Sequence, residues 1–430
     1  MQRTLLRPIS SLRTVLSAKV ESKREQLAFL RECGKTPIDD MRVSEILEGM
    51  NTMKTVLCET SRVDGKGLKL RGYSLSELIY LLPGKRKQPS LESVLWLLLT
   101  GEIPSWSEYE AFVEEISKDS DLPKATEDLL FSLPKEMHPM TQFSIALQSL
   151  NEHSQYSKSL LILPEEDHWK PMLEDILFLV SKLPRIAGII YRNTFKDGKV
   201  CSPGHYDLAE NYGRMLGWKD ESFFEALRLF LLIHSDHEGG NVSTHTTKVI
   251  GSYKNNAFQA YSAGLNGLAG PIHGLGIQFC MMWLVDMWKT LGDNYDEKVV
   301  EIYVKGYLKD HGKVPGFGHP VLKSTDTRFL VQMEFADRYF KDDPLCKLIK
   351  VCNKVVPQLL NEHGKKNSYS NMYLHSGSIF YHYGLRAYEY YCVLFGVARA
   401  VGALSNLFWD RALMLEPEQL EHISLEDLEA

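Results

Sequence analysis

The sequence lacks most of the motifs that would indicate a nucleotide-dependent, redox or hydrolytic enzyme. It has no P-loop, no Gly-x-Gly-x-x-Gly fingerprint and no Gly-x-Ser-x-Gly elbow, so those nucleotide-binding classes and the serine hydrolases have no support. Seven cysteines are scattered through 430 residues without a Cys-x-x-Cys pair. An odd, scattered set argues against a disulfide framework or a zinc site and favours a reducing compartment. Internal repeats and low-complexity tracts are absent as well.

The N-terminal end of the chain lacks acidic residues, and the C-terminal end lacks basic ones. No acid occurs before Glu21, and the charges in the first twenty residues are Arg3, Arg7, Arg13 and Lys19. With the Ser, Thr and interspersed apolar residues, this composition predicts a mitochondrial transit peptide at residues 1–20 and a matrix location; the alternative is a basic, frayed terminus. After Arg411 no Lys or Arg occurs while acids accumulate, which predicts a solvated acidic tail. The net charge of −6 gives no overall attraction to nucleic acid or to anionic membranes.

A single long apolar stretch, from Tyr390 to Trp409, contains one charge, Arg399, at its middle. A central arginine costs about 2.5–3.5 kcal/mol on membrane-insertion scales, so we predict a buried core helix and no transmembrane segment. A buried arginine needs an anion, which makes Arg399 a candidate ligand for an acidic substrate.

Helix signals dominate the rest of the chain, and no alternation of strands and helices occurs, so we predict an all-α protein. At this length it can bury a large core and form two domains. Capping boxes begin at Ser74 and Ser105, and the one hairpin candidate is Thr55–Tyr73, with Asp64-Gly65 as its turn. Apolar periodicity predicts helices at Leu91–Thr100, Phe223–Ile233, Phe258–Leu268, Pro271–Leu291, Glu297–Lys309, Phe329–Phe340, Leu345–Leu360 (kinked or divided at Pro357) and Tyr388–Leu413.

The stretch Gly264–Gly276 surrounds one histidine, His273, with five glycines and a proline. If the following helix starts at Pro271, His273 lies in its first turn. There the positive end of the helix dipole would lower the pKa of the imidazole and favour a nearby anion. A neutral histidine beside an anion site can exchange a proton with a substrate. The alternative is a hinge with a packed histidine.

A second stretch, His234–His245, contains three histidines with Asp236 and Glu238. Its spacing does not match the His-Glu-x-x-His zinc motif and no cysteine lies nearby, so we predict no metal. A histidine-lined anion pocket is favoured over a set of hydrogen-bonded core histidines.

A third stretch, Val314–Arg328, places a Gly-x-Gly loop ahead of a histidine, a lysine and an arginine. Backbone N–H groups and these cations suit a carboxylate or phosphate. Taken with the other stretches, the residue types predict a di- or tricarboxylate site formed by His237, His273, His319, Arg328 and Arg399.

Four segments in this order and spacing resemble the citrate synthase family of the mitochondrial type: HSDHEGGNVSTHT, NGLAGPIHGL, VPGFGHPVLKSTDTR and YYCVLFGVARAVG. The resemblance extends from Met41 through Leu413. It implies an all-α homodimer whose two helical domains close over oxaloacetate and admit acetyl-CoA. The large domain would comprise residues 21–273 and 379–430, and the small domain residues 274–378. No permanently bound cofactor is implied; acetyl-CoA or CoA would be the co-substrate.

The resemblance also implies roles for individual residues. His273 would polarise the thioester carbonyl, and His319 would protonate the oxaloacetate carbonyl. The carboxylates of oxaloacetate would be bound by His237, Arg328 and Arg399. The coenzyme A adenine would lie against the loop of Val314, Gly316, Phe317 and Gly318, with Lys323 in place of a family arginine that contacts a coenzyme A phosphate.

The sequence departs from the family where the family's chemistry takes place. The family's base, an aspartate in Asn-Val-Asp-Ala-His-Ser-Gly, is replaced by Tyr373 in Asn-Met-Tyr-Leu-His-Ser-Gly. A phenol with a reference pKa near 10 is protonated at matrix pH. Glu418-Gln419-Leu420 stands where the family's tail arginine is expected, and Glu165 and its acidic neighbours stand where a coenzyme-binding cation is expected.

We therefore predict a mitochondrial citrate-synthase-like protein that keeps an oxaloacetate or citrate pocket, has impaired or lost condensation activity, and acts as a structural or assembly-type dimer. This prediction is compatible with membership of a larger mitochondrial assembly, and nucleic-acid binding is not expected. The alternatives are a working citrate synthase that uses Glu362, His375 or water as its base, and a related synthase with another acyl-CoA or keto acid.

Overall fold

The computed structural model describes residues 11–420 and residue 424, except residues 39–40, 48, 50–53, 66, 119, 294 and 320–321. Residues 1–10 of the predicted leader and most of the acidic tail after residue 420 lie outside this range. Helices form nearly all of the regular structure, which confirms the predicted all-α class.

The helices lie in the following order along the chain. They are α1 (Leu12–Glu32), α2 (Val43–Leu47), α3 (Leu75–Leu81), α4 (Leu91–Thr100), α5 (Trp106–Lys118), α6 (Lys124–Ser132), α7 (Pro139–Ser149), α8 (Gln155–Ser159), α9 (Trp169–Phe195), α10 (Leu208–Leu216), α11 (Glu221–His234), α12 (Val242–Ser252), α13 (Ala257–Leu268), α14 (Gly276–Leu291), α15 (Glu297–His311), α16 (Thr327–Tyr339), α17 (Pro344–Glu362), α18 (Tyr373–His382) and α19 (Tyr391–Ala412). Short 3₁₀ helices are Asn151–His153, Glu165–Asp167 and Tyr388–Tyr390.

The predicted hairpin is part of a small antiparallel sheet with the order β1 (Ser61–Asp64), β2 (Gly67–Leu70) and β3 (Tyr73–Ser74). Asp64 pairs with Gly67, so Gly65 rather than Asp64 opens the loop between the first two strands, one residue later than predicted. The third strand is short and leads directly into α3 through a capping box at Ser74 and Glu77.

The periodicity predictions agree with the observed helices to within a few residues except at Pro271. The helix predicted from Pro271 starts five residues later, at Gly276, because residues 271–275 form turns. Pro357 does not divide α17, which continues to Glu362. An interior proline costs about 3 kcal/mol, and burial of the apolar face of a nineteen-residue helix offsets it.

The long apolar helix α19 lies at the centre of the core. It packs against α4, α9, α11, α12 and α13. The stretch Tyr388–Ala412 has the length and hydropathy of a membrane span, but its apolar window is entirely buried within the described protein. The prediction of a core helix that carries Arg399 into the interior is therefore confirmed.

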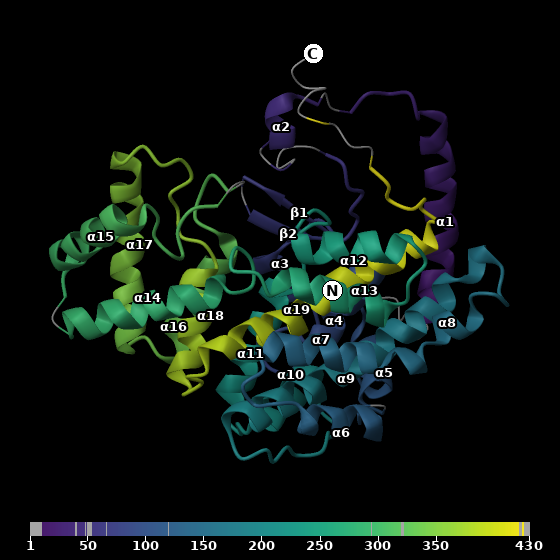
Figure 1. Ribbon diagram of the computed structural model, residues 1–430, viewed down its shortest axis with the longest axis horizontal. Helices are drawn as coiled ribbons and strands as arrows, with labels where there is room; N and C mark the ends of the chain where they lie inside the picture. Colours follow the sequence, from purple (N-terminus) through teal and green to yellow (C-terminus); the bar gives the residue numbers. More distant parts are fainter. Residues whose placement is uncertain are drawn as a thin grey trace, which may run out of the picture.

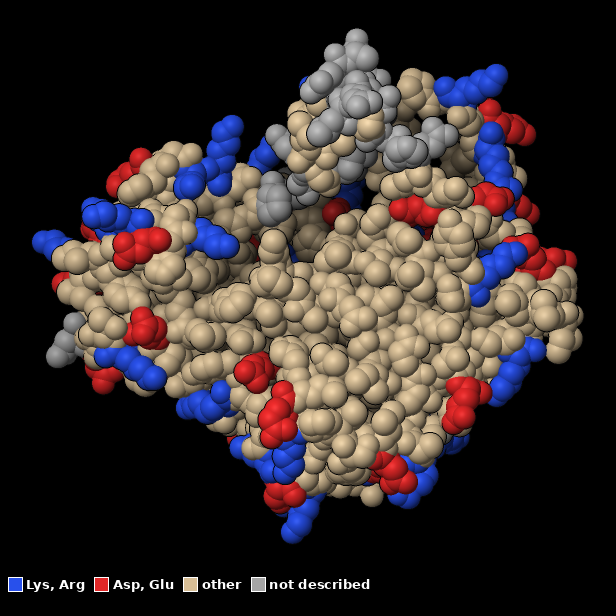
Figure 2. All heavy atoms as spheres, viewed as in Figure 1, with Lys and Arg blue, Asp and Glu red and all other residues tan. Residues whose placement is uncertain are grey.

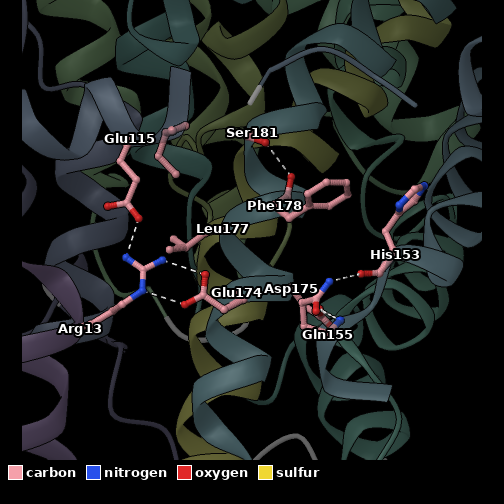
Figure 3. Close-up of a pocket in the computed structure, with 10 residues that line it drawn as sticks. Arg13, Glu115, His153, Gln155, Glu174, Asp175, Leu177, Phe178 and Ser181 are labelled. Carbon is pink, nitrogen blue, oxygen red and sulfur yellow. Dashed lines mark hydrogen bonds and ion pairs between the residues drawn. The ribbon is translucent and has the colours of Figure 1, made fainter. Parts of the chain in front are cut away.

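Residues of the predicted transit peptide anchor α1 to the rest of the fold. Leu12, Leu16 and Val20 are buried, with at most 1% of their surface exposed. Arg13 forms ion pairs with Glu174 of α9 at 2.7 Å and Glu115 of α5 at 2.5 Å, at the edge of a cavity of about 300 Å³ (Figure 3). Residues 12–20 are thus an integrated part of the helical core.

Figure 1 shows α14 to α18 gathered on one side of the molecule, away from α5, α6 and α8 on the other. Within the first group α14 packs against α17 and α18, and α15 against α17. The helix α19 extends from this group across the molecule toward α1. The candidate site lies where the two sides meet, because its residues come from both.

Candidate active site

All six predicted catalytic and substrate-binding residues line one cavity of about 230 Å³. It lies between the α11–α12 loop, the turn before α14, the loop before α16, the starts of α16 and α18, and α19. The lining residues are His237, Asn241, Ile272, His273, Gly318, His319, Arg328, Asn371, Met372, Tyr373, Phe395 and Arg399. Segments separated by as many as 162 residues of sequence, from His237 to Arg399, therefore converge on one cavity.

The two arginines of the cavity are almost fully buried, each with 1% of its surface exposed. Arg399 donates from Nε to the His234 carbonyl at 3.1 Å and from Nη1 to Asn241 Oδ1 at 3.0 Å, and both of these partners are uncharged. Burial lowers the pKa of Arg399. Arg328 has no hydrogen-bond partner for Nη1 among the described residues, although this atom is buried. Both side chains therefore retain capacity for an anionic ligand.

Sequence reasoning missed Asp326, which holds Arg328 in place. Its carboxylate is 2.8 Å from Arg328 Nη2 and also accepts the backbone N–H groups of Arg328 and Met372. Burial acts to raise the pKa of Asp326, but the adjacent guanidinium outweighs it and holds the pKa below its usual range. The available signal was local: an aspartate two residues ahead of an arginine at a helix start is typical of an N-cap.

The three cavity histidines are neutral near pH 7. Burial, with Arg399 as the second cause, lowers the pKa of His273 to about 3. Burial and Arg328 lower the pKa of His319 to about 4. For His237, burial and both arginines hold the pKa well below its usual value. Neutral imidazoles can each donate and accept one hydrogen bond, so the cavity offers a ligand both kinds of contact.

The sequence predicted that His273 lies in the first turn of a helix, and this prediction is wrong. The histidine lies in the turns that precede α14, so the lowered pKa comes from burial and Arg399 rather than from a helix dipole. Its Nε2 is 3.0 Å from Ser243 Oγ, which lies 2.7 Å from Asn241 Oδ1. Because an amide oxygen has no proton, the hydroxyl donates to Asn241 and accepts from His273. The Nδ1 atom of His273 is then the unprotonated ring nitrogen.

Tyr373 stands at the start of α18 with its side chain in the cavity wall. Its hydroxyl donates to the His273 carbonyl oxygen at 3.2 Å. The ring lies so close to Gly276 that a Cβ there would be 2.7 Å from it. Burial raises the pKa of Tyr373, so the phenol stays protonated.

No aspartate or glutamate is among the described residues that line the cavity. Glu362 is exposed at the end of α17, and His375 is buried away from the cavity with its Nδ1 2.7 Å from Ser378 Oγ. Neither of the protein groups considered as a substitute base therefore faces the ligand space.

Of the residues predicted for coenzyme A, which lie in the loop before α16, Gly318 alone lines the cavity. Gly316 and Gly318 have φ values of 80° and 83°, which favour glycine, and Val314 is buried. Phe317 is half-buried and pairs with Ser370 across a single β-bridge. Lys323 is exposed, with its aliphatic part about 3.7 Å from the position of a Gly65 Cβ. Its charge is therefore available to a ligand outside the cavity.

The acidic tail folds against its own chain as far as it is described. Glu418 lies 2.9 Å from His245 Nε2, and its backbone N–H donates to Ser252 Oγ. Glu165 likewise forms an ion pair with Lys254 at 2.9 Å. Both acids that replace expected cations thus have local partners.

Comparison with known proteins gives one consistent result. The family description "Citrate synthase, C-terminal domain" matches residues 46–417. The probable mitochondrial citrate synthase of Glossina morsitans morsitans is 40% identical over 423 residues, which are 96% of this chain and 91% of that one. The peroxisomal citrate synthase of Saccharomyces cerevisiae is 40% identical over 404 residues, 93% of this chain and 88% of that one.

Solved structures show the same fold. The citrate synthase of Thermoplasma acidophilum, solved with carboxymethyl coenzyme A and oxaloacetate, has a TM-score of 0.72 over 90% of this chain and 100% of its own. Its sequence identity is 18%, so this match supports the fold alone.

Proposed function

The chain belongs to the citrate synthase family, and from this premise we propose that it binds oxaloacetate or citrate but has an impaired or lost ability to condense acetyl-CoA with oxaloacetate. In this proposal it serves as a structural or assembly-type dimer in mitochondria. The observation that carries the proposal is a cavity with two buried arginines and no carboxylate among the described residues that line it.

The binding half of the proposal rests on charge. A buried guanidinium without a carboxylate partner is costly unless an anion reaches it. Arg399 hydrogen-bonds only to neutral partners. Arg328 is paired with Asp326 through Nε and Nη2, but its buried Nη1 has no partner among the described residues. A dicarboxylate would bring one negative charge to each arginine, with the neutral imidazoles of His237, His273 and His319 as hydrogen-bonding partners.

The catalytic half rests on Tyr373. In the family the corresponding residue is an aspartate that removes a methyl proton from acetyl-CoA. A buried, protonated phenol cannot accept that proton, and its hydroxyl already donates to the His273 carbonyl. Loss of a general base lowers a rate by roughly 10²- to 10⁴-fold. Glu362 and His375 point elsewhere, so a working enzyme would need water or Nδ1 of His273 as its base.

A thiol-release assay with acetyl-CoA and oxaloacetate tests the proposal. We expect the purified protein to release CoA at no more than about a thousandth of an ordinary enzyme's rate, in line with loss of the base. Oxaloacetate should nevertheless raise its Tm. Turnover at an ordinary rate would replace the proposal with an active citrate synthase, the second candidate, which the retained His237, Arg328 and Arg399 favour.

The substitution Tyr373→Asp separates the causes of an inactive enzyme. Recovery of turnover would assign the deficit to the missing base. No recovery, with oxaloacetate binding intact, would assign it to the coenzyme side, where Lys323 and the loop of Val314, Gly316, Phe317 and Gly318 would have to hold CoA. Tyr373→Phe is the matched control, because it keeps the ring and supplies no base.

The homodimer is part of the proposal because one broad face of the molecule carries no charge at its centre. In Figure 2 the Lys, Arg, Asp and Glu side chains surround this face, and its middle, over α12 and α13, shows none. The cores of protein interfaces contain fewer charged residues than the rest of the surface. The mass of the purified protein in solution, measured by light scattering, tests this: a monomer at micromolar concentration would contradict it.

The mitochondrial location is supported by the basic, acid-free N-terminus and by the mitochondrial citrate synthases among the similar proteins, which also include a peroxisomal one. We propose that any cleavage of the leader falls ahead of Ser11, which caps α1, because a cut after residue 20 would remove three buried apolar residues and Arg13. N-terminal sequencing of the protein from mitochondria tests this, and a mature chain that starts at residue 21 would contradict it.

A further inference from the structure

The residue after His237 is held in an unfavourable backbone conformation by the neighbouring strand. Glu238 has a φ of 58°, which residues other than glycine rarely adopt. Its backbone N–H donates to Ser61 Oγ at 2.7 Å, and its carboxylate accepts the backbone N–H of Val63 at 2.6 Å. Such strain persists only where the surroundings enforce it, and it is concentrated at functional sites.

The residue before His237 is held by a chain of hydrogen bonds. Asn406 of α19 donates its two amide hydrogens to the Gly402 carbonyl and to Thr60 Oγ1, at 2.9 and 2.8 Å. The single Thr60 proton therefore goes to Asp236 Oδ2, at 2.5 Å. Asp236 Oδ1 then accepts the backbone N–H of His237 at 2.9 Å. Thr60 and Asp236 are both completely buried.

The same hairpin also contacts the segment that carries Arg328. Gly67 approaches α16 so closely that a Cβ there would be 2.5 Å from Thr327 Oγ1. Ser324 Oγ donates to the Gly65 carbonyl oxygen at 3.3 Å. One hairpin thus touches both segments that provide carboxylate ligands, although neither Thr60 nor Glu238 lines the cavity.

We infer that the β1–β2 hairpin fixes the position of His237 relative to Arg328, and that Thr60 and Glu238 are positioning residues for the dicarboxylate ligand. This inference rests on the proposed function, because it assumes that the cavity binds such a ligand. Thr60 fixes the backbone N–H of His237 through Asp236, and Glu238 fixes the backbone that follows. Loss of either contact lets the imidazole move from the ligand while the cavity itself remains.

The test uses Thr60→Val, which keeps the shape and removes the hydroxyl. Isothermal titration should show oxaloacetate affinity reduced by about tenfold, the effect of one lost hydrogen bond to a buried charge. Thr60→Ser restores the donor and should keep the affinity within a factor of about three. The matched control is Ser154→Ala, because Ser154 Oγ also donates to a buried aspartate, Asp175, at 2.5 Å, beside the remote cavity of Figure 3. It should lower Tm without changing the affinity.

A second readout needs no ligand. Nitrogen-15 spectra of the histidine side chains should show a shift of the His237 signals in Thr60→Val and none in Ser154→Ala. If Thr60→Val does not fold, Glu238→Leu replaces it, with Glu238→Gln, which keeps an acceptor for Val63, as its control. The inference is overturned if the folded variant leaves both the affinity and the His237 signals unchanged. Failure of the unaltered protein to bind oxaloacetate would instead refute the proposed function, and the His237 signals would still decide the role of the hairpin.

Discussion

Two regions of the molecule are built around buried arginines, and they differ in how each charge is compensated. Arg228 of α11 is fully buried among three carboxylates, with Asp207 at 2.9 Å, Glu225 at 2.8 Å and Glu210 at 3.6 Å. Burial acts to lower the pKa of Arg228, but Asp207 and Glu225 outweigh it and raise the pKa. In the cavity, by contrast, Arg399 has only neutral hydrogen-bond partners.

The difference separates a structural arginine from a ligand-binding one. Where carboxylates of the protein already surround a guanidinium, an external anion has nothing to add. Where they are missing, the protein tolerates an incompletely compensated charge that a ligand can complete. Burial alone therefore does not distinguish a structural arginine from a ligand-binding one, whereas the hydrogen-bond partners of the guanidinium do.

The largest effect on stability should follow from Arg228→Met. This change leaves Asp207, Glu225 and Glu210 buried without their cation, and breaking a buried pair in this way costs about 3–5 kcal/mol. Chemical denaturation should show this loss of stability. Oxaloacetate should still stabilise the fraction of the variant that folds. A loss below about 1 kcal/mol would remove the distinction between the two regions.

Arg399→Met should show the opposite pattern. The free protein should lose no more than about 1 kcal/mol, because Arg399 hydrogen-bonds to no carboxylate and its loss breaks no hydrogen-bonded ion pair. The affinity for oxaloacetate should fall by about a hundredfold, as expected for loss of a charge-assisted contact to a buried ligand. Equal binding by the variant would show that the cavity does not take its anion at this side chain.

Glu92→Gln tests the carboxylate-rich region through pH. Burial, and then Asp207, raise the pKa of Glu92 to about 7, while the unfolded chain titrates near its ordinary value of 4.5. Between these two pKa values Glu92 is protonated in the folded protein and ionised in the unfolded chain. The stabilisation that comes from the protonated Glu92 is therefore present at low pH and is lost as pH rises through about 7. Relative to the unaltered protein, the variant should gain about 2 kcal/mol between pH 5.5 and 8. A constant difference across that range would contradict the shift.

The smallest effect is expected from pH on the cavity itself. With the pKa of His273 at about 3 and that of His319 at about 4, both imidazoles of the free protein are neutral well below pH 6. Oxaloacetate affinity should therefore change by less than about threefold between pH 6.5 and 8. A steep rise toward pH 6.5 would mean that an imidazolium binds the ligand.

Much of this organisation was predictable from the sequence. Helical periodicity located α11, α13, α15, α16 and α17 to within a few residues, because their apolar faces follow the helical repeat. Among the candidate site residues, His237, His273, His319 and Arg328 lie in segments rich in glycine, histidine and charged residues. Arg399 was recognisable as the one charge in a long apolar stretch, and Tyr373 through the resemblance of its motif. The start of α14 was not predictable, because glycine-rich turns and a helix beginning with proline share the same local signals.

The partners of the site residues could not be predicted. Nothing near Thr60 in the sequence indicates that it supports Asp236, which lies 176 residues later. Asn241 and Ser243 follow His237 closely, yet their hydrogen bonds to Arg399 and His273 depend on how α12, α14 and α19 meet. The replacement of an aspartate by Tyr373 was visible from the motif, whereas the contact of its hydroxyl with the His273 carbonyl was not.

The sequence by itself determined the helical class, the positions of most helices, and the set of histidines and arginines available for an anion. Only the tertiary structure decided which buried arginines are compensated, that His273 precedes its helix, and that no carboxylate faces the cavity among the described residues. The physical reason is that the compensation of a buried charge depends on distances of a few ångströms between segments far apart in the chain, and local patterns carry no information about those distances.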